Sequence, residues 1–288
     1  MEQQAAVERH RQSRLPDGSV LHVWQPEATP RGRVLLQHGL FEYAERYVDE
    51  YSQLVPELTS RGFEVWALDL LGHGKSSGDR GVVDLVAALE SHLSVRREAV
   101  ADGLPLLLLG HSLGGLLTAA SVAAKQSGII GAVVMSPALA GPTSARVRRG
   151  LRAAAHRWPG APAPTRKAPR SGLTSRADVL ERSAIDPMMG ERGISLMVGS
   201  SVLDISDVVW RAADDWRVPT LVVHGELDRW TNPRRSRELV ERINRDDVVR
   251  VEVAGGLHEL LHDTDASSTL ELVLGWVEGR FGGRSPRA

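Results

Sequence analysis

Short apolar runs alternate with longer amphipathic stretches along most of this chain. Runs with the character of buried strands occupy residues 33–37, 63–69, 104–109, 129–135, 219–225 and 248–254. Apolar residues at helical spacing predict helices over residues 47–61, 82–101, 116–125, 234–243 and 266–281. Residues 19–24 alternate between apolar and polar and predict an edge strand. Strands alternating with helices predict a mostly parallel sheet covered on both faces, with ligands bound beyond the carboxyl ends of its strands.

Residues 138–215 interrupt this alternation. No clear strand pattern occurs there, and four prolines (Pro159, Pro162, Pro164 and Pro169) crowd its middle. A structureless loop of this length is improbable inside a compact domain. We therefore expect an inserted, mainly helical cap over residues 138–215 and a core of residues 1–137 and 216–288. A disordered linker is a weaker interpretation, because the chain after it supplies only the last elements of the same fold.

Composition narrows the classes of function. The 288 residues are 42% hydrophobic and carry a net charge of −1, so a large core is available and no strong field favours nucleic acid. The absence of cysteine excludes disulfides, cysteine-based zinc sites and thiol catalysis. The polar start shows no secretory signal, and no apolar stretch approaches the roughly 18 residues that span a bilayer. We expect a soluble, cytoplasmic protein with no nucleic-acid partner.

The sequence Gly110-His111-Ser112-Leu113-Gly114-Gly115 lies between a predicted strand and a predicted helix. A G-x-S-x-G sequence in this context predicts a nucleophile elbow, a strained turn that exposes the Ser112 hydroxyl at a helix N-terminus. Side chains at Gly110 or Gly114 would collide with the neighbouring strand or helix. The alternative, a glycine-rich corner of a nucleotide-binding fold, usually needs more glycines or a lysine at fixed spacing.

A serine nucleophile needs a base, usually a histidine held by a carboxylate. In elbow-type hydrolases the acid and then the histidine follow the serine along the chain. Asp228 and His258 each follow a predicted buried strand, so we expect them to be the acid and the base. Glu226 on the same loop and His262 one helical turn beyond are the competing candidates.

Two backbone amides should stabilise the oxyanion that forms during the reaction. We expect one at Leu113, directly after the nucleophile, and the other at Leu40, where Gly39 permits a tight turn after an early strand. The alternative for residues 38 and 39 is an ordinary turn that ends a strand. His224 is expected to pack at its strand end, and the His111 side chain to point away from Ser112.

These motifs resemble the α/β-hydrolase fold and, within it, the monoacylglycerol lipase and lysophospholipase family. The matching segments run in family order from the early strand to the last helix: His38–Tyr47 with Glu42, Asp69–Ser76, Gly110–Gly115, His224–Asp228 and His258–Glu259. The resemblance implies a Ser112, Asp228 and His258 triad, oxyanion amides at Leu40 and Leu113, and no metal or organic cofactor. It also implies a cap that shapes an apolar acyl tunnel and often contacts membranes.

The cap departs from that family. Nine basic residues occur between residues 142 and 177 without one acid: Arg146, Arg148, Arg149, Arg152, Arg157, Arg166, Lys167, Arg170 and Arg176. They form either a solvated surface or a surface for anionic lipid headgroups or an anionic substrate. Nearby apolar residues, including Met188, Met189 and Met197, form either an adaptable acyl pocket or the cap's own core.

The sequence therefore predicts a serine carboxylester hydrolase whose small-molecule substrate is an acyl ester with an apolar chain, as in a monoacylglycerol lipase or lysophospholipase. A thioesterase, an acyltransferase, a small-ester esterase or a lactonase would use the same triad. An aminopeptidase would need a fixed acidic subsite, for which the cap offers few acids. A non-catalytic ligand-binding receptor on a hydrolase scaffold is the alternative from a different class. Peripheral contact with a membrane through the basic cap is a further expectation.

Overall fold

The central feature of the fold is an eight-stranded sheet. The computed structural model describes residues 9–165, 169–189 and 193–282. In this part of the chain the strands are β1 (His10–Arg14), β2 (Val20–Trp24), β3 (Gly32–Gln37), β4 (Phe63–Asp69), β5 (Leu106–His111), β6 (Gly131–Met135), β7 (Thr220–Gly225) and β8 (Val248–Val253). Their order is β1-β2-β4-β3-β5-β6-β7-β8, and only the pairs β1–β2 and β2–β4 are antiparallel. The predicted mostly parallel sheet is confirmed.

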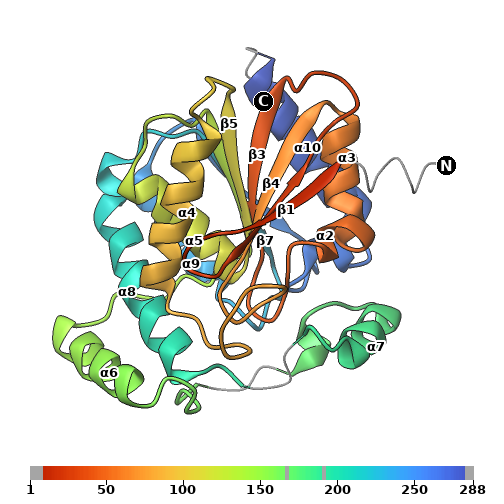
Figure 1. Ribbon diagram of the computed structural model, residues 1–288. Coiled ribbons are helices and arrows are strands. Elements are labelled where there is room, and N and C mark those ends of the chain that lie inside the picture. Colours follow the sequence, from red (N-terminus) through yellow and green to blue (C-terminus); the bar gives the residue numbers. More distant parts are fainter. Residues whose placement is uncertain (1–8, 166–168, 190–192, 283–288) are drawn as a thin grey trace.

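Helices cover both faces of the sheet (Figure 1). One face carries α4 (Leu85–Ala99), α5 (Leu113–Ala124), α8 (Leu196–Ala212) and α9 (Pro233–Ile243). The other face carries α2 (Arg46–Asp49), α3 (Leu54–Ser60) and α10 (Ala266–Phe281). Because successive side chains of a strand point to opposite faces, Leu35 and Leu36 of β3 enter different cores, and both are fully buried.

The prediction of an edge strand at residues 19–24 is wrong. The corresponding strand β2 is buried along its whole length, because β1 pairs with it and forms the edge instead. The segment His10–Arg14 is entirely polar, so its sequence carries no apolar alternation that would predict a strand. Its polar composition suits the exposed edge of a sheet, where charged side chains discourage pairing with another chain.

The predicted helix over residues 47–61 is also wrong as a single element. Helices α2 and α3 are separated by the 3-10 turn Tyr51–Gln53, in which all three residues have positive φ. The Tyr51 backbone N–H donates to His262 Nε2 at 2.6 Å, and the Tyr51 hydroxyl donates to Glu42 at 2.5 Å. These long-range bonds hold a break that the local apolar spacing does not reveal.

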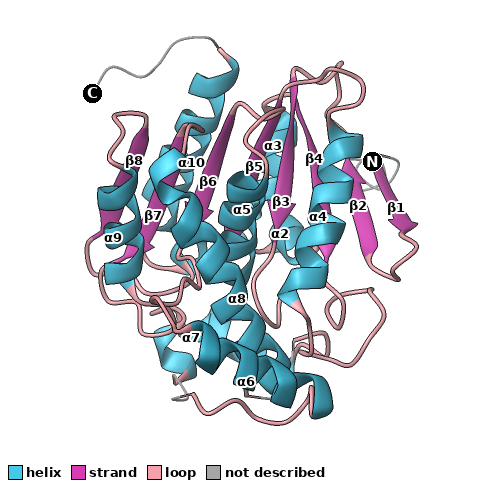
Figure 2. Ribbon diagram, turned by 90° about the vertical axis from the view of Figure 1, so that its left-hand side faces the viewer, coloured by secondary structure: helices cyan, strands magenta, loops and turns pink. Residues whose placement is uncertain are grey.

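The segment 138–215 lies mainly at the carboxyl ends of the strands. Helices α6 (Ala145–Arg157) and α7 (Ala177–Ile185) lie beyond those ends in both views (Figures 1 and 2). Its described residues contain no strand, only an isolated bridge between Pro162 and Ser195. Helix α8 packs along α5 and places Val198, Ile205 and Val209 in the core beside the sheet. The division into a core and a cap at residues 138 and 215 stays a prediction.

Several basic residues of this segment are paired with acids from inside and outside it. Arg148 contacts Asp207 at 3.0 Å, and Arg152 pairs with Asp84 at the start of α4 at 2.5 Å. Arg176 pairs with Asp178 at 2.7 Å. The predicted basic residues Arg166 and Lys167 lie outside the described residues. Among the helices that the structure describes, none combines the length and the apolar character needed to cross a membrane.

Candidate active site

Ser112 occupies a sharp turn between β5 and α5. Its backbone has φ 55° and ψ −118°, a conformation that residues other than glycine rarely adopt. A Cβ atom at Gly110 would lie 2.3 Å from the Gly114 carbonyl oxygen, and one at Gly114 would lie 2.1 Å from the Gln37 carbonyl oxygen. The turn therefore requires both glycines, as the elbow prediction states, and it leaves Ser112 9% exposed.

The structure brings the three predicted side chains together. The Ser112 hydroxyl lies 2.9 Å from His258 Nε2, and His258 Nδ1 lies 2.8 Å from Asp228 Oδ2. The residues come from the loops after β5, β7 and β8, whose carboxyl ends lie along one edge of the sheet with β6 between β5 and β7. With its proton on Nδ1, the imidazole donates to Asp228 and presents Nε2 to the hydroxyl. This geometry suits transfer of the serine proton to the histidine.

Asp228 is held by several donors besides His258. Its Oδ1 accepts from the backbone N–H groups of Trp230 at 2.8 Å and Thr231 at 2.9 Å, and its Oδ2 accepts from the Thr231 hydroxyl at 2.7 Å. Burial disfavours the charged form of Asp228. The neighbouring His258 and the bonds from His224, His258 and Thr231 outweigh burial and hold the pKa of Asp228 well below its usual range. The carboxylate therefore stays ionised beside the imidazole.

The loop with Leu40 lies directly against the nucleophile. A Cβ atom at Gly39 would come within 3.0 Å of Ser112 Cβ, so glycine is needed there for close approach. The positive φ of the turn, 64°, lies at Phe41, which corrects the expectation that Gly39 supplies the turn. Leu113 is the first residue of α5. Within the described residues, no hydrogen bond takes up the amides of Leu40 or Leu113, so both remain able to donate to a ligand.

Comparison with known families identifies the chain. The family model described as "Serine aminopeptidase, S33" matches residues 28–265, and the monoacylglycerol lipase of Mycolicibacterium smegmatis is 30% identical over 90% of this chain and 92% of its own length. The chain belongs to this family of α/β-hydrolases. The monoglyceride lipase of Rattus norvegicus is 28% identical over 92% of this chain and 89% of its own.

Solved structures agree with the assignment of this hydrolase. The monoacylglycerol lipase of Paleococcus ferrophilus superposes with a TM-score of 0.78 at 30% identity, covering 90% of this chain and 99% of that one. A carboxyl esterase from Bacillus coagulans has a TM-score of 0.80 at 18% identity, covering 94% and 98% of the two chains. The second likeness shows the fold alone.

The two competing candidates of the hydrolase have other partners. Glu226 accepts a hydrogen bond from the Gly255 N–H at 2.9 Å, on the exposed side of its loop. His262 contacts the Glu259 carboxylate through Nδ1 at 2.7 Å and accepts from the Tyr51 N–H through Nε2. The geometry thus favours Asp228 and His258 over these alternatives.

Three further residues contact the candidate triad: His224, which is expected from the sequence to pack at its strand end, and Trp230 and Thr231. His224 is fully buried, and its Nε2 lies 3.2 Å from Asp228 and 3.0 Å from the Thr231 hydroxyl. Burial lowers the pKa of His224, so its ring stays neutral. Trp230 stacks near His258 with ring centres 6.3 Å apart, and its indole donates to the Pro169 carbonyl. Thr231 and Trp230 share the loop of Asp228, but neither matches a motif that predicts contact with it.

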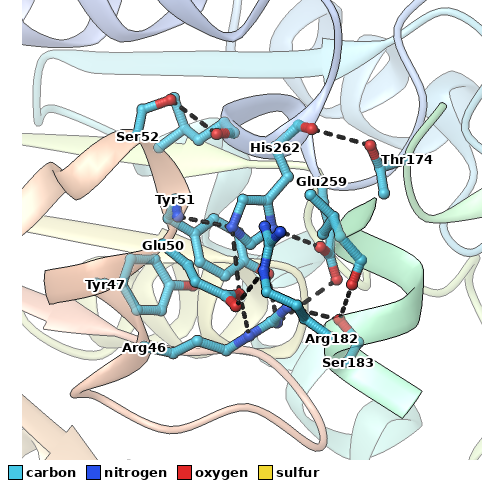
Figure 3. A network of polar contacts seen from close by, with 12 residues as sticks. Arg46, Tyr47, Glu50, Tyr51, Ser52, Thr174, Arg182, Ser183, Glu259 and His262 are labelled. Carbon is cyan, nitrogen blue, oxygen red and sulfur yellow. Dashed lines mark hydrogen bonds and ion pairs between the residues drawn. The ribbon is translucent and has the colours of Figure 1, made fainter. Parts of the chain in front are cut away.

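A network of polar contacts joins Glu259, the residue after His258, to helix α7 (Figure 3). Arg46 donates to the Ser183 hydroxyl of α7 at 2.9 Å and lies 3.7 Å from Glu259, the residue after His258. The Glu259 backbone N–H donates to the Leu173 carbonyl at 2.7 Å. The members of this cluster are far apart in the chain, so no local sequence pattern predicts it.

One group of described residues has the composition of a metal site. It consists of His10, His22 and Glu45, on and beside the edge strand of the sheet. His10 Nε2 already lies 3.1 Å from His22 Nδ1, and Glu45 pairs with the Lys75 ammonium at 2.9 Å. We therefore assign no metal to it, and the absence of metals and cofactors stays a prediction.

Proposed function

We propose that this family member is a serine carboxylester hydrolase that cleaves an acyl ester with an apolar chain. The observation that carries the proposal is a chain of two hydrogen-bond contacts. The Ser112 hydroxyl lies 2.9 Å from His258 Nε2, and His258 Nδ1 lies 2.8 Å from Asp228 Oδ2. A serine at a strained elbow with this partner is a nucleophile for acyl transfer.

The proposed reaction has two steps. His258 takes the proton of Ser112 while its oxygen attacks the ester carbonyl, and the Leu40 and Leu113 amides donate to the resulting oxyanion. His258 then protonates the departing alcohol, which leaves an acyl-enzyme. Water, deprotonated by His258, attacks the acyl group and restores Ser112 as the acid product departs. Asp228 orients the imidazole in both steps.

Monoacylglycerol or a lysophospholipid is the substrate class that we propose. Relatives named monoacylglycerol lipase match nearly the full chain. A peptide amine is a poorer candidate, because the cap acids Asp178, Asp204 and Asp207 contact arginines instead of standing free to bind it. Thioester hydrolysis, acyl transfer and small-ester or lactone hydrolysis would use the same triad, and ligand binding without catalysis is the alternative from a different class.

A panel of p-nitrophenyl esters and monoacylglycerols of increasing acyl length tests this proposal, with an aminoacyl p-nitroanilide as the peptidase probe. We expect an optimum at long chains, no hydrolysis of the anilide, and a loss of at least about 10⁴-fold in kcat for Ser112→Ala. Activity on acetate alone would indicate a small-ester enzyme. Esterase activity retained in Ser112→Ala would contradict the proposal.

Hydrolysis of monoacylglycerol in vesicles of different charge tests the predicted membrane contact through the cap. Within the described residues Arg146, Arg149 and Arg157 form no ion pair, and Trp158 beside them is 57% exposed. Each basic residue at an anionic surface contributes on the order of 1 kcal/mol. We expect faster hydrolysis of monoacylglycerol in anionic vesicles than in neutral ones. Equal rates would contradict the membrane contact and leave the proposed chemistry intact.

A further inference from the structure

His111 precedes the nucleophile and contacts the loops on both sides of it. Its side chain is 2% exposed. Its Nε2 lies 3.1 Å from the backbone carbonyl oxygen of His258, and its Nδ1 lies 3.2 Å from Oε1 of Glu42. The side chain points away from the Ser112 hydroxyl, as expected, and the proposed proton transfers do not use it.

The partners of His111 determine its charge. A carbonyl oxygen and a carboxylate oxygen both carry lone pairs and only accept hydrogen bonds. A neutral imidazole with its proton on Nε2 would donate to the His258 carbonyl but leave an unprotonated Nδ1 3.2 Å from the Glu42 carboxylate. One with its proton on Nδ1 would direct the Nε2 lone pair at the His258 carbonyl. The doubly protonated imidazolium alone avoids both repulsions, and its contact with Glu42 is then a close ion pair without hydrogen-bond geometry at Nδ1.

The opposing Glu42 is itself held as a carboxylate. It accepts from the Gly39 backbone N–H at 2.9 Å, the Tyr47 hydroxyl at 2.8 Å and the Tyr51 hydroxyl at 2.5 Å. Burial opposes its charge, but His111, Arg46 and the Tyr51 hydroxyl hold the pKa of Glu42 well below its usual range. Burial likewise opposes the charge on His111, but Glu42 and then Glu259 raise its pKa.

Other groups around His111 are consistent with a charged ring. The Tyr51 and His258 rings lie 5.6 and 4.9 Å away between centres. Glu259 faces the same cluster, where its charge is shared with Arg46 at 3.7 Å (Figure 3). Arg46 also pairs with Glu50 at 2.9 Å, and Arg182 of α7 contacts the same Glu50 at 3.4 Å.

We propose that His111 is a positioning residue: a buried imidazolium that ties the Glu42 loop, which carries the Leu40 amide, to the loop of His258. Its effect on catalysis rests on the proposed function, whereas its charge does not. Glu42 fixes the Gly39 amide directly before Leu40, and His111 fixes the carbonyl of His258 itself. Loss of the ion pair should therefore disturb the oxyanion site and the base together.

The charge is tested on the unmodified protein by NMR of the imidazole nitrogens, with His111 assigned through its neighbours Tyr51 and His258. We expect both ring nitrogens to stay protonated from about pH 6 to well above the ordinary histidine pKa of about 6.5. In Glu42→Gln the ring should lose a proton within this range. A neutral His111 ring in the unmodified protein at neutral pH would overturn the proposal, and this measurement needs no substitution.

The positioning role is tested by kinetics on a p-nitrophenyl ester. Glu42→Gln should lower kcat by roughly 10- to 100-fold with KM changed by less than about twofold, since small misplacements of reacting groups lower the rate more than binding. Glu64→Gln is the matched control, a buried carboxylate paired with Arg33 at 2.5 Å at the opposite end of the sheet. It should lose stability but keep kcat.

Equal kcat in the two variants would overturn the positioning role. An unmodified protein inactive on every ester, yet with both His111 nitrogens protonated, would reject the proposed function alone and leave the charge assignment standing. An active protein with a neutral His111 ring would reject the charge assignment and leave the proposed function standing.

Discussion

The positions of Ser112, Asp228 and His258 depend on the elbow glycines, on the ends of the strands and on the hydrogen-bond donors around Asp228. Only the first two can be recognised in the sequence. The elbow glycines and the strand ends predict where the three side chains begin. The orientation of the Asp228 carboxylate depends on hydrogen bonds donated by Trp230 and Thr231, two and three residues further along its loop. Such a short polar loop has no periodicity, so these contacts could not be predicted from the sequence.

Asp228→Asn tests the role of this carboxylate. An amide in its place can accept or donate, so the imidazole loses the partner that fixes its proton on Nδ1. We expect kcat to fall by about 10⁴-fold, the effect of the corresponding change in serine proteases, with little change in KM. Steady-state kinetics on a p-nitrophenyl ester provide the measurement.

Glu226→Gln is the matched control for Asp228→Asn, since it changes the other acid of the same loop. It should keep a rate near that of the unmodified protein, because Glu226 bonds only the Gly255 amide among the described contacts. The reverse result, with Asp228→Asn active and Glu226→Gln inactive, would move the acid role to Glu226.

Secondary-structure elements were predictable where apolar runs are buried from both sides. β4 and α10 have the predicted bounds, and α9 begins one residue earlier than predicted. The predicted helix over residues 82–101 is shorter, because Asp84 caps it by accepting from the Val86 N–H at 3.0 Å. The break between α2 and α3 depends on contacts with residues more than two hundred positions away, so no local pattern predicts it.

Helix α4 buries a histidine whose ionisation should make stability depend on pH. His92 is fully buried, and neither of its ring nitrogens has a hydrogen-bond partner among the described residues. Burial lowers its pKa to about 3. Between about pH 6.5 and pH 3, His92 therefore binds a proton in the unfolded chain but stays neutral in the folded helix. The free energy of unfolding falls as pH falls through this window, by up to about 1.4 kcal/mol per pH unit for one group.

His92→Leu should remove this contribution. Urea unfolding at several pH values is the measurement, and we expect a shallower loss of stability below about pH 6.5. The exposed His156 of α6 gives the control His156→Leu, which should leave the slope unchanged. An unchanged slope in His92→Leu would show that His92 is protonated in the folded helix or that its site opens in acid.

The whole molecule gathers its candidate chemistry at one end of the sheet. Loops after β3, β5, β7 and β8 supply the oxyanion segment, the serine, the acid and the histidine, because the carboxyl ends of parallel strands share one edge. The alternation of strands with helices predicts the class of fold, a mostly parallel sheet, but it does not predict the order of the strands. The placement of α6 and α7 over this edge was not predictable either, since Arg152 reaches Asp84 and Arg46 reaches Ser183 across long separations in the chain.

Covalent labelling by a fluorophosphonate tests the central claim, that Ser112 is an activated nucleophile, most directly. Intact mass and peptide mapping after brief exposure at neutral pH should show one adduct per chain, located on Ser112, and none in Ser112→Ala. Asp228→Asn should react far more slowly. A folded protein that stays unlabelled, or one labelled at a different residue, would contradict the account, and the unlabelled result would support a ligand-binding protein on a hydrolase scaffold instead.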